Sequence, residues 1–203
     1  MKTIIIAFLS ILSVTVTSCS KNDEINEVTL ELSNLEKQDL IFLREEEKLA
    51  RDVYLYAFEK YHEQIFYNIS QSEQQHMNSV LYLLNKYNLE DPIIEALGVF
   101  SNQDLQQLYN QLTAQVDISI IEALKVGATI EDLDIKDIDE FELNTQSLDI
   151  LNVYSGLKCG SRNHLRSFVL ELDLNSISYS SQFISNEEYN EIIESDKERC
   201  GGI

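Results

Sequence analysis

The stretch ISQSEQQHMNSVLYLLNKY, residues 69–87, decides the fold. It lacks Gly and Pro, and its apolar side chains recur at the spacing of one helix face: Ile69, Met77, Val80, Leu84 and Tyr87. We predict a helix over about residues 66–87 that ends before Asp91-Pro92, because a residue preceding Pro avoids helical geometry. Glu73 and His76 occupy the centre of the apolar face, so both are expected to point into the interior.

Similar amphipathic runs lie on both sides of this segment. They predict three more long helices, over about residues 35–61, 118–141 and 146–172, and shorter helices at about 102–115 and 186–195. Four long amphipathic helices, with a short helical detour between the second and third and a short C-terminal helix, indicate an all-α four-helix bundle. Gly127 lies within the third long helix, where Gly costs about 1 kcal/mol relative to Ala, so we expect it to allow close backbone approach at a crossing.

The composition excludes several other classes of protein. The chain has 203 residues, with one Pro, six Gly and 35 acidic against 15 basic side chains. So few Pro and Gly argue against an all-β sandwich or barrel, whose turns need both. A net charge of −20 repels phosphates, so we expect no nucleic-acid partner, and most of the acidic residues are expected to form a solvated helix surface.

The N-terminal residues are expected to lie outside the folded domain. Residues 1–18 combine Lys2, a short apolar run and small residues, which is typical of an export signal. Val16-Thr17-Ser18-Cys19 resembles the lipobox of bacterial lipoproteins, and it predicts that a lipidated Cys19 anchors the protein to a membrane of the cell envelope. Residues 19–34 are predicted to be a flexible tether, 35–195 the domain and 196–203 a tail.

With Cys19 acylated, Cys159 and Cys200 are left in a compartment that permits disulfides. A disulfide that fixes the tail and a pair of free thiols are both compatible with the sequence. The two residues do not have the short spacing of a cysteine-based metal or redox motif.

One carboxylate of the run Glu45-Glu46-Glu47 is expected to point toward the core. The helical phase set by Leu49 and Val53 puts Glu46 near the centre of the apolar face. The same phase puts Glu45 and Glu47 on either side of it, where we expect them to face water.

The third and fourth long helices carry polar residues on their apolar faces as well. Glu131 lies at the middle of the third helix's stripe, with Asp134 about 60° away on the same side. Asp132 and Asp137 are expected to face water. His164 lies on the apolar side of the fourth long helix.

Ionisable groups buried on apolar faces require compensation, from a cation or from one another. A Glu and a His three residues apart on a helix can reach one metal ion, an arrangement seen in carboxylate-bridged di-metal bundles. The sequence therefore predicts a metal site at the middle of the bundle, with these candidate ligands: Glu46, Glu73, His76, Glu131, His164 and, as a further candidate, Asp134. The alternative is a buried hydrogen-bond network of the same residues.

Five ordered stretches resemble the bacterial and archaeal DUF2202 family. They are REEEKLARDVY (44–54), SEQQHM (72–77), GVF (98–100), ALKVGA (123–128) and SRNHLR (161–166). The family looks like a branch of the ferritin-like, rubrerythrin-related superfamily, and the resemblance covers about residues 36–195. It implies a ferritin-like bundle with metal in its core, and no established reaction.

The chain departs from the wider ferritin-like pattern in its last long helix. A symmetric di-iron bundle supplies Glu-x-x-His from two helices, whereas here Ser161 precedes His164 by three residues. One carboxylate is therefore missing, and Asp134 is a candidate replacement. One ion and two ions both remain compatible, and Glu and His donors suit Fe, with Mn or Zn as alternatives.

Three functions are compatible with these residues. The first is an exported oxidase or peroxidase that reacts with O₂ or peroxide, with catalytic residues unknown. The second is a non-catalytic protein that binds or stores metal and presents its acidic surface to a partner at the envelope. The third is a purely structural bundle. A homodimer and an unidentified protein partner are both compatible with the sequence.

Overall fold

The computed structural model describes residues 31–201, and this part of the chain is helical, without strands. Its helices are α1 (Asn34–Tyr61), α2 (Gln64–Lys86), α3 (Gln103–Val116), α4 (Ile120–Glu142), α5 (Leu148–Leu174) and α6 (Asn186–Glu194). The predicted all-α bundle is confirmed, including the short helix between the second and third long helices and the short helix near the C-terminus.

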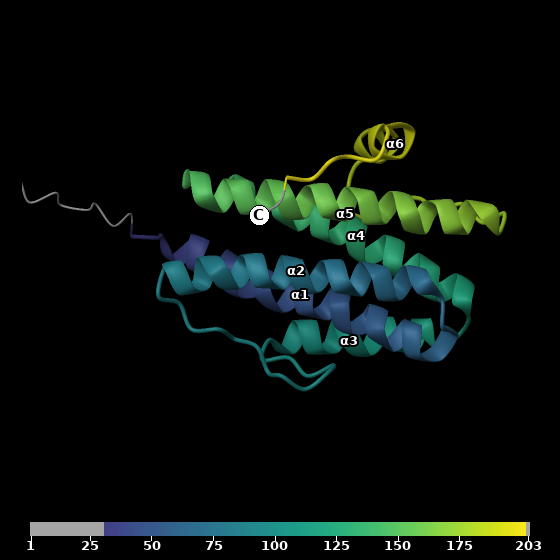
Figure 1. Cartoon of the computed structure of the whole chain (residues 1–203), viewed down its shortest axis with the longest axis horizontal. Helices are drawn as coiled ribbons and strands as arrows, with labels where there is room; N and C mark the ends of the chain where they lie inside the picture. The colour runs from purple at the N-terminus through teal and green to yellow at the C-terminus, as the bar shows by residue number, and fades with distance from the viewer. Residues whose placement is uncertain (1–30, 202–203) are drawn as a thin grey trace, which may run out of the picture. The chain divides into compact units, whose positions relative to one another are not determined.

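The bundle consists of two helical hairpins. α1 packs along α2 and α4 packs along α5, while α1 also contacts α4 and α2 contacts α5 (Figure 1). α3 packs against α1 and α4, and α6 packs against α5 alone among the helices of the described chain. All four long helices therefore face a common interior.

The helix ends follow from local sequence. The Ser33 hydroxyl accepts from the backbone N–H of Glu36, whose carboxylate accepts in return from the N–H of Ser33, which makes a capping box at the start of α1. Ser119 caps α4 through the N–H of Glu122. α1 stops at His62, which has the left-handed φ of 57° and donates its N–H to Phe58.

The apolar core is divided into two clusters. One contains Ala50, Ile69, Ile135 and Leu165 among its buried residues. The other contains these buried residues: Leu43, Val80, Ile138, Val153 and Leu157. On α1, α2 and α5, the buried polar residues of the predicted site fall between the two clusters in sequence, and on α4 they lie just before Ile138 of the second cluster. A polar layer therefore crosses the middle of the bundle.

Gly127 allows a close approach, although the neighbour is a side chain and not a backbone. The ring of Phe168 on α5 occupies the space next to this glycine, and an added Cβ would overlap it. The third long helix therefore needs Gly at this position in order to pack against α5.

The two ends of the domain extend slightly beyond the predicted limits. Leu32, within the predicted tether, is buried. Cys200, within the predicted tail, forms a disulfide with Cys159 of α5. The predicted export signal and Cys19 lie outside the described residues. Among the helices at residues 31–201, none is long and apolar enough to cross a membrane.

Candidate metal centre

The middle of α1 is buried on all sides, because α2, α3 and α4 all pack around it. Residues 43–50 are all buried, including the three consecutive glutamates. The helical phase therefore could not separate inward from outward positions here. The expectation that Glu45 and Glu47 face water is wrong.

Glu45 binds the start of α3. Its carboxylate accepts from the backbone N–H groups of Ser101 and Asn102, at 2.6 and 3.1 Å. A carboxylate at a helix N-terminus satisfies N–H groups that have no partner within the helix. Glu45 therefore has a structural partner and is not available to the centre.

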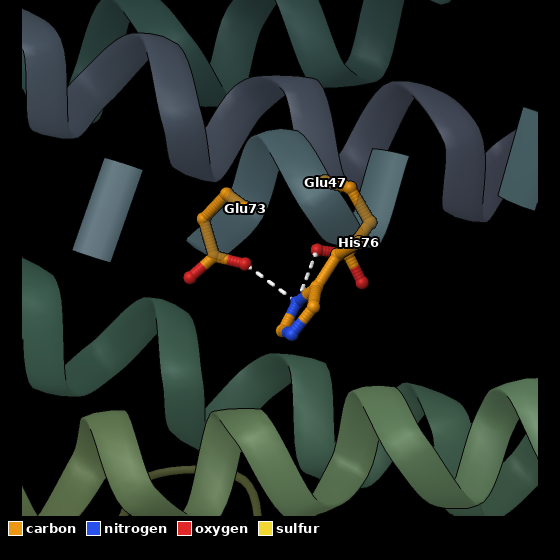
Figure 2. A group of neighbouring side chains, drawn as sticks. All are labelled: Glu47, Glu73 and His76. Atoms are coloured by element: carbon orange, nitrogen blue, oxygen red, sulfur yellow. Dashed lines mark hydrogen bonds and ion pairs between the residues drawn. The ribbon is translucent and has the colours of Figure 1, made fainter. Parts of the chain in front are cut away.

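Glu47 points into the polar layer. Its side chain is fully buried, and its Oε2 lies 3.1 Å from Nδ1 of His76 on α2 (Figure 2). Oε2 of Glu73 lies 2.7 Å from the same nitrogen. We call Glu47, Glu73 and His76 the first half-centre.

Glu73 also belongs to a second group. Its other oxygen, Oε1, lies 2.8 Å from Nδ1 of His164 on α5, and Oε2 of Glu131 on α4 lies 3.4 Å from that nitrogen. We call Glu73, Glu131 and His164 the second half-centre. The single carboxylate of Glu73 thus divides its oxygens between the two histidines.

Nδ1 of His76 is hydrogen-bonded to Oε2 of Glu47, but several of the other close atoms point at common spaces rather than at one another. Both oxygens of Glu73 and Nδ1 of His164 lack a partner in hydrogen-bond geometry, despite separations below 3 Å. In each half-centre, the three ligand atoms lie within 4.8 Å of one another. Buried carboxylate oxygens and imidazole nitrogens without partners, gathered around one space, fit a metal ion.

Tyr54 holds one ligand of the second half-centre. Its hydroxyl is fully buried and donates to Oε1 of Glu131 at 2.6 Å. This leaves Oε2 of Glu131 facing His164. Such outer hydrogen bonds orient metal ligands.

Glu46 and Asp134 are buried beside the two half-centres without joining either triad. All four of their carboxylate oxygens lack hydrogen-bond partners, and both residues line a small space of about 30 Å³ among α1, α3 and α4. Burial raises the pKa of Asp134 well above its usual value, and the charges of Glu46 and Glu47 raise it further. Glu46, the predicted ligand of α1, therefore belongs to neither triad. Its neighbour Glu47 supplies the carboxylate of α1 instead.

The pKa values of the candidate ligands show how the charges in the polar layer are balanced when no cation is bound. Burial lowers the pKa of His164, but the carboxylates of Glu73 and Glu131 outweigh this and raise it to about 9. Burial raises the pKa of Glu47 to about 7, although His76 opposes the rise. Burial also disfavours ionised Glu73, yet the two histidines keep its pKa below its usual value. Protons on the histidines thus compensate the carboxylates.

One other residue differs from expectation, and Ser161 agrees with it. Asp132 is fully buried and accepts from the Tyr179 hydroxyl and the N–H of Ile184, so its predicted exposure is wrong. The chain after α5 folds back and covers it. Ser161 donates its hydroxyl to the Leu157 carbonyl and supplies no ligand, so α5 contributes His164 alone to the triads.

Glu47 and Tyr54 are the centre residues that the sequence reasoning missed. The helical phase of α1 predicts a solvent-facing Glu47 because it treats one side of the helix as exposed. A signal for Tyr54 was present, since it lies seven residues after Glu47, two helical turns along the same face.

The comparisons with known proteins identify relatives without an assigned activity. The chain is 53% identical over 169 residues to the uncharacterised protein MJ0754 of Methanocaldococcus jannaschii, covering 83% of this chain and 91% of that protein. The crystal structure of hypothetical protein MJ0754 from Methanococcus jannaschii is similar with a TM-score of 0.81 and 52% identity, covering 82% of this chain and 96% of that one.

The chain also matches a domain family. DUF2202, described as an uncharacterised protein domain, matches residues 36–196, which include α1 except for its first two residues, α2 through α6, and every residue of the two half-centres. The chain therefore belongs to the DUF2202 family.

Proposed function

We propose that the domain binds two transition-metal ions, with iron as the first candidate and Mn or Zn as alternatives. Glu47 and His76 would hold one ion, Glu131 and His164 the other, and Glu73 would bridge them. One observation carries the proposal: the two oxygens of Glu73 face the Nδ1 atoms of two different histidines, in a buried layer with unpartnered carboxylates. A ferritin-like di-metal bundle supplies ligands in this way, which supports placing the fold in that superfamily.

The electrostatics of the layer support the same proposal. Glu46, Glu47, Glu73, Glu131 and Asp134 are all nearly fully buried. The nearest lysine along α1, Lys48, is paired with Asp52 instead. Carboxylates gathered in an apolar interior need a cation or protons, and divalent ions neutralise them while using the unpartnered oxygens.

The donor set suits a redox-active ion. Glu and His ligands without thiolates are typical of non-haem iron and manganese, and such ions, when bound, exchange electrons with O₂ or peroxide. The chain's own contribution is to fix the ligands, through the bridge by Glu73 and the hydroxyl of Tyr54, and to exclude bulk water by burial. Cys159 and Cys200 form a disulfide, so an oxidase or peroxidase here would take electrons from an outside reductant.

Metal content and turnover test the proposal separately. The mature domain should bind two ions per chain in a titration, and Glu73→Gln should bind none. Iron(II) should then be oxidised by O₂ or peroxide over many turnovers when a reductant is supplied. Oxidation limited to one round would favour metal binding or storage without catalysis. Absence of metal binding would leave a structural network.

We also propose that the protein is exported and anchored to the cell envelope through a lipidated Cys19. The export signal and lipobox-like residues support this, and a disulfide between Cys159 and Cys200 suits an oxidising compartment. Cys19→Ser should abolish fatty-acid labelling and release the protein from membranes, since the acyl chains provide the anchor. Unchanged membrane partition of the variant would contradict the anchor.

A further inference from the structure

A cleft lies on the outer side of the two histidines. It has a volume of about 720 Å³ and is bounded by α2, α5 and the C-terminal segment. A volume of this order suits a small organic ligand, since such sites are commonly about 300–1,000 Å³. His76 and His164 form part of its floor.

The second ring nitrogen of each histidine, Nε2, is on the side of the cleft. The side chains of His76 and His164 are only 9% and 11% exposed, and each turns Nδ1 toward the carboxylates. Figure 2 shows the other nitrogen of His76 pointing away from Glu47 and Glu73. No described residue accepts a hydrogen bond from Nε2 of either histidine. Metal-binding histidines usually donate this second N–H to an acceptor, and residues 31–201 supply none here.

Gly160 leaves space for the ring of His76 at the floor of the cleft. An added Cβ at this position would lie 2.5 Å from Nε2 of His76. The absence of a side chain thus leaves room for the ring.

The walls of the cleft carry hydrogen-bond donors and no carboxylates. Among the described residues that line it, none is Asp or Glu, although acidic residues outnumber basic ones 35 to 15 in the chain. Gln75 and Asn78 of α2 contribute amide groups and Lys197 of the C-terminal segment contributes an ammonium. The amide of Asn163 on α5 also lines the cleft, but it already donates to Glu198 and Cys200. This chemistry is opposite to that of the acidic surface and favours an anion.

The segment that carries Lys197 is fastened to α5. The neighbouring Glu198 pairs with Arg162 at 2.5 Å and with Arg166 at 3.0 Å. The disulfide between Cys200 and Cys159 fixes the segment on the other side of Lys197. Lys197 is therefore held at the edge of the cleft, and its ammonium has no ion-pair partner among the described residues.

We propose that the cleft binds a small oxyanion, a carboxylate or a phosphate, whose oxygens accept from the Nε2–H groups of His76 and His164. The amides of the walls complete its hydrogen bonds, and Lys197 balances its charge. The inference rests on the proposed function in one respect: histidines bound to metal at Nδ1 keep their remaining proton on Nε2. The anion would then contact the metal ligands directly and tune the centre from outside.

Calorimetric titration of the mature protein tests this. The probes are succinate and inorganic phosphate, each added to the metal-free and zinc-loaded protein. Saturable binding of one probe is expected, and the tighter one identifies the class of anion.

Asn78→Asp, which adds a negative charge without a change of size, should weaken binding at least about tenfold. Lys197→Met should weaken it about fivefold, as for an exposed charge pair. The control Asn110→Asp, on α3 outside the cleft, should leave it unchanged.

The outcomes separate this inference from the proposed function. Zinc is counted independently in every sample. Zinc bound without saturable binding of either anion would overturn the anion site and leave the metal centre standing. If Asn78→Asp and Lys197→Met leave the anion affinity unchanged, the anion does not bind in this cleft. Anion binding to a protein that takes up no zinc would support the cleft and reject the metal proposal.

Discussion

The two half-centres share Glu73 but are assembled differently. The first draws Glu47, Glu73 and His76 from α1 and α2, which are consecutive in the chain and form one hairpin. The second combines Glu73 of α2 with Glu131 of α4 and His164 of α5, so it joins both hairpins. The second also has the Tyr54 hydroxyl bound to one of its carboxylates.

This difference separates local from tertiary contributions to the site. Within the first half-centre, Glu73 and His76 are three residues apart on α2, and Glu47 lies opposite them in the same hairpin. The second half-centre exists only when the hairpins dock. An ion there should therefore stabilise the packing of α1–α2 against α4–α5, whereas an ion in the first should mainly stabilise one hairpin.

Removal of the shared ligand should have the largest effect. Glu73→Gln keeps the size of the side chain but removes the charge from both half-centres. We expect the content of bound metal to fall from two ions to none, with each affinity lowered about 100-fold or more. Elemental analysis after dialysis measures this. Glu63→Gln, at the exposed N-cap of α2, is the control and should keep two ions.

Substitution of the histidines should separate the half-centres. His76→Ala should lose the first ion and His164→Ala the second, so each variant should bind one ion per chain. His62→Asn, an exposed residue at the C-cap of α1, should still bind two. Loss of both ions from either histidine variant would show that the half-centres do not bind independently. Equal loss in His62→Asn would place the site at the end of the bundle.

Much of the bundle was predictable because its helices follow a simple periodicity. Each long helix presents apolar residues at one face over most of its length, and polar residues such as Glu73 and His76 interrupt that face where the two core clusters meet. The position of Glu131 and His164 followed from the same rule. These residues lie on helices that keep a solvated side, so the sequence pattern distinguishes inward from outward positions.

The rule failed where a helix has no solvated side. At Glu45 to Glu47, α2, α3 and α4 surround α1, so all three carboxylates are buried and each finds a different environment. Asp132 was misplaced because residues 179–184, distant in sequence, fold over it. The disulfide between Cys159 and Cys200 likewise depends on how the chain returns after α6, which no local pattern specifies.

The pH dependence of the metal-free protein should distinguish the half-centres further. Glu47 titrates near 7 in the folded protein, above its ordinary value of 4.5, so the stability that its proton provides is lost as pH rises to about 7. His164 titrates near 9 against 6.5, so its contribution is complete below about pH 6.5 and is lost as pH rises to about 9. The second loss is on the order of 3 kcal/mol.

Urea unfolding at several pH values, with a chelator present, measures both steps. Glu47→Gln should remove the lower-pH step. His164→Ala should remove the loss near pH 9 and leave the contribution of His76, whose pKa Glu73 and Glu47 raise well above its usual value despite its burial. Metal-loaded protein should show neither step, since the ions replace the protons. Metal affinity should rise with pH over the same range. A free energy of unfolding that increases between pH 6.5 and 9 in the metal-free protein would contradict these protonation states.

The smallest effect should come from Tyr54→Phe, which removes one oxygen atom. The hydroxyl of Tyr54 donates to Glu131 at 2.6 Å, so its loss leaves a buried carboxylate oxygen without its donor and lets the side chain turn. The affinity for the second ion should fall about tenfold, while that for the first is unchanged. Stepwise titration against a competing chelator resolves the two affinities. Tyr154→Phe is the matched control, because that tyrosine is equally buried but lies in the other apolar cluster. Equal weakening of both ions would mean that Tyr54 acts through the packing of the whole bundle, and an unchanged second affinity would mean that its hydroxyl does not position Glu131.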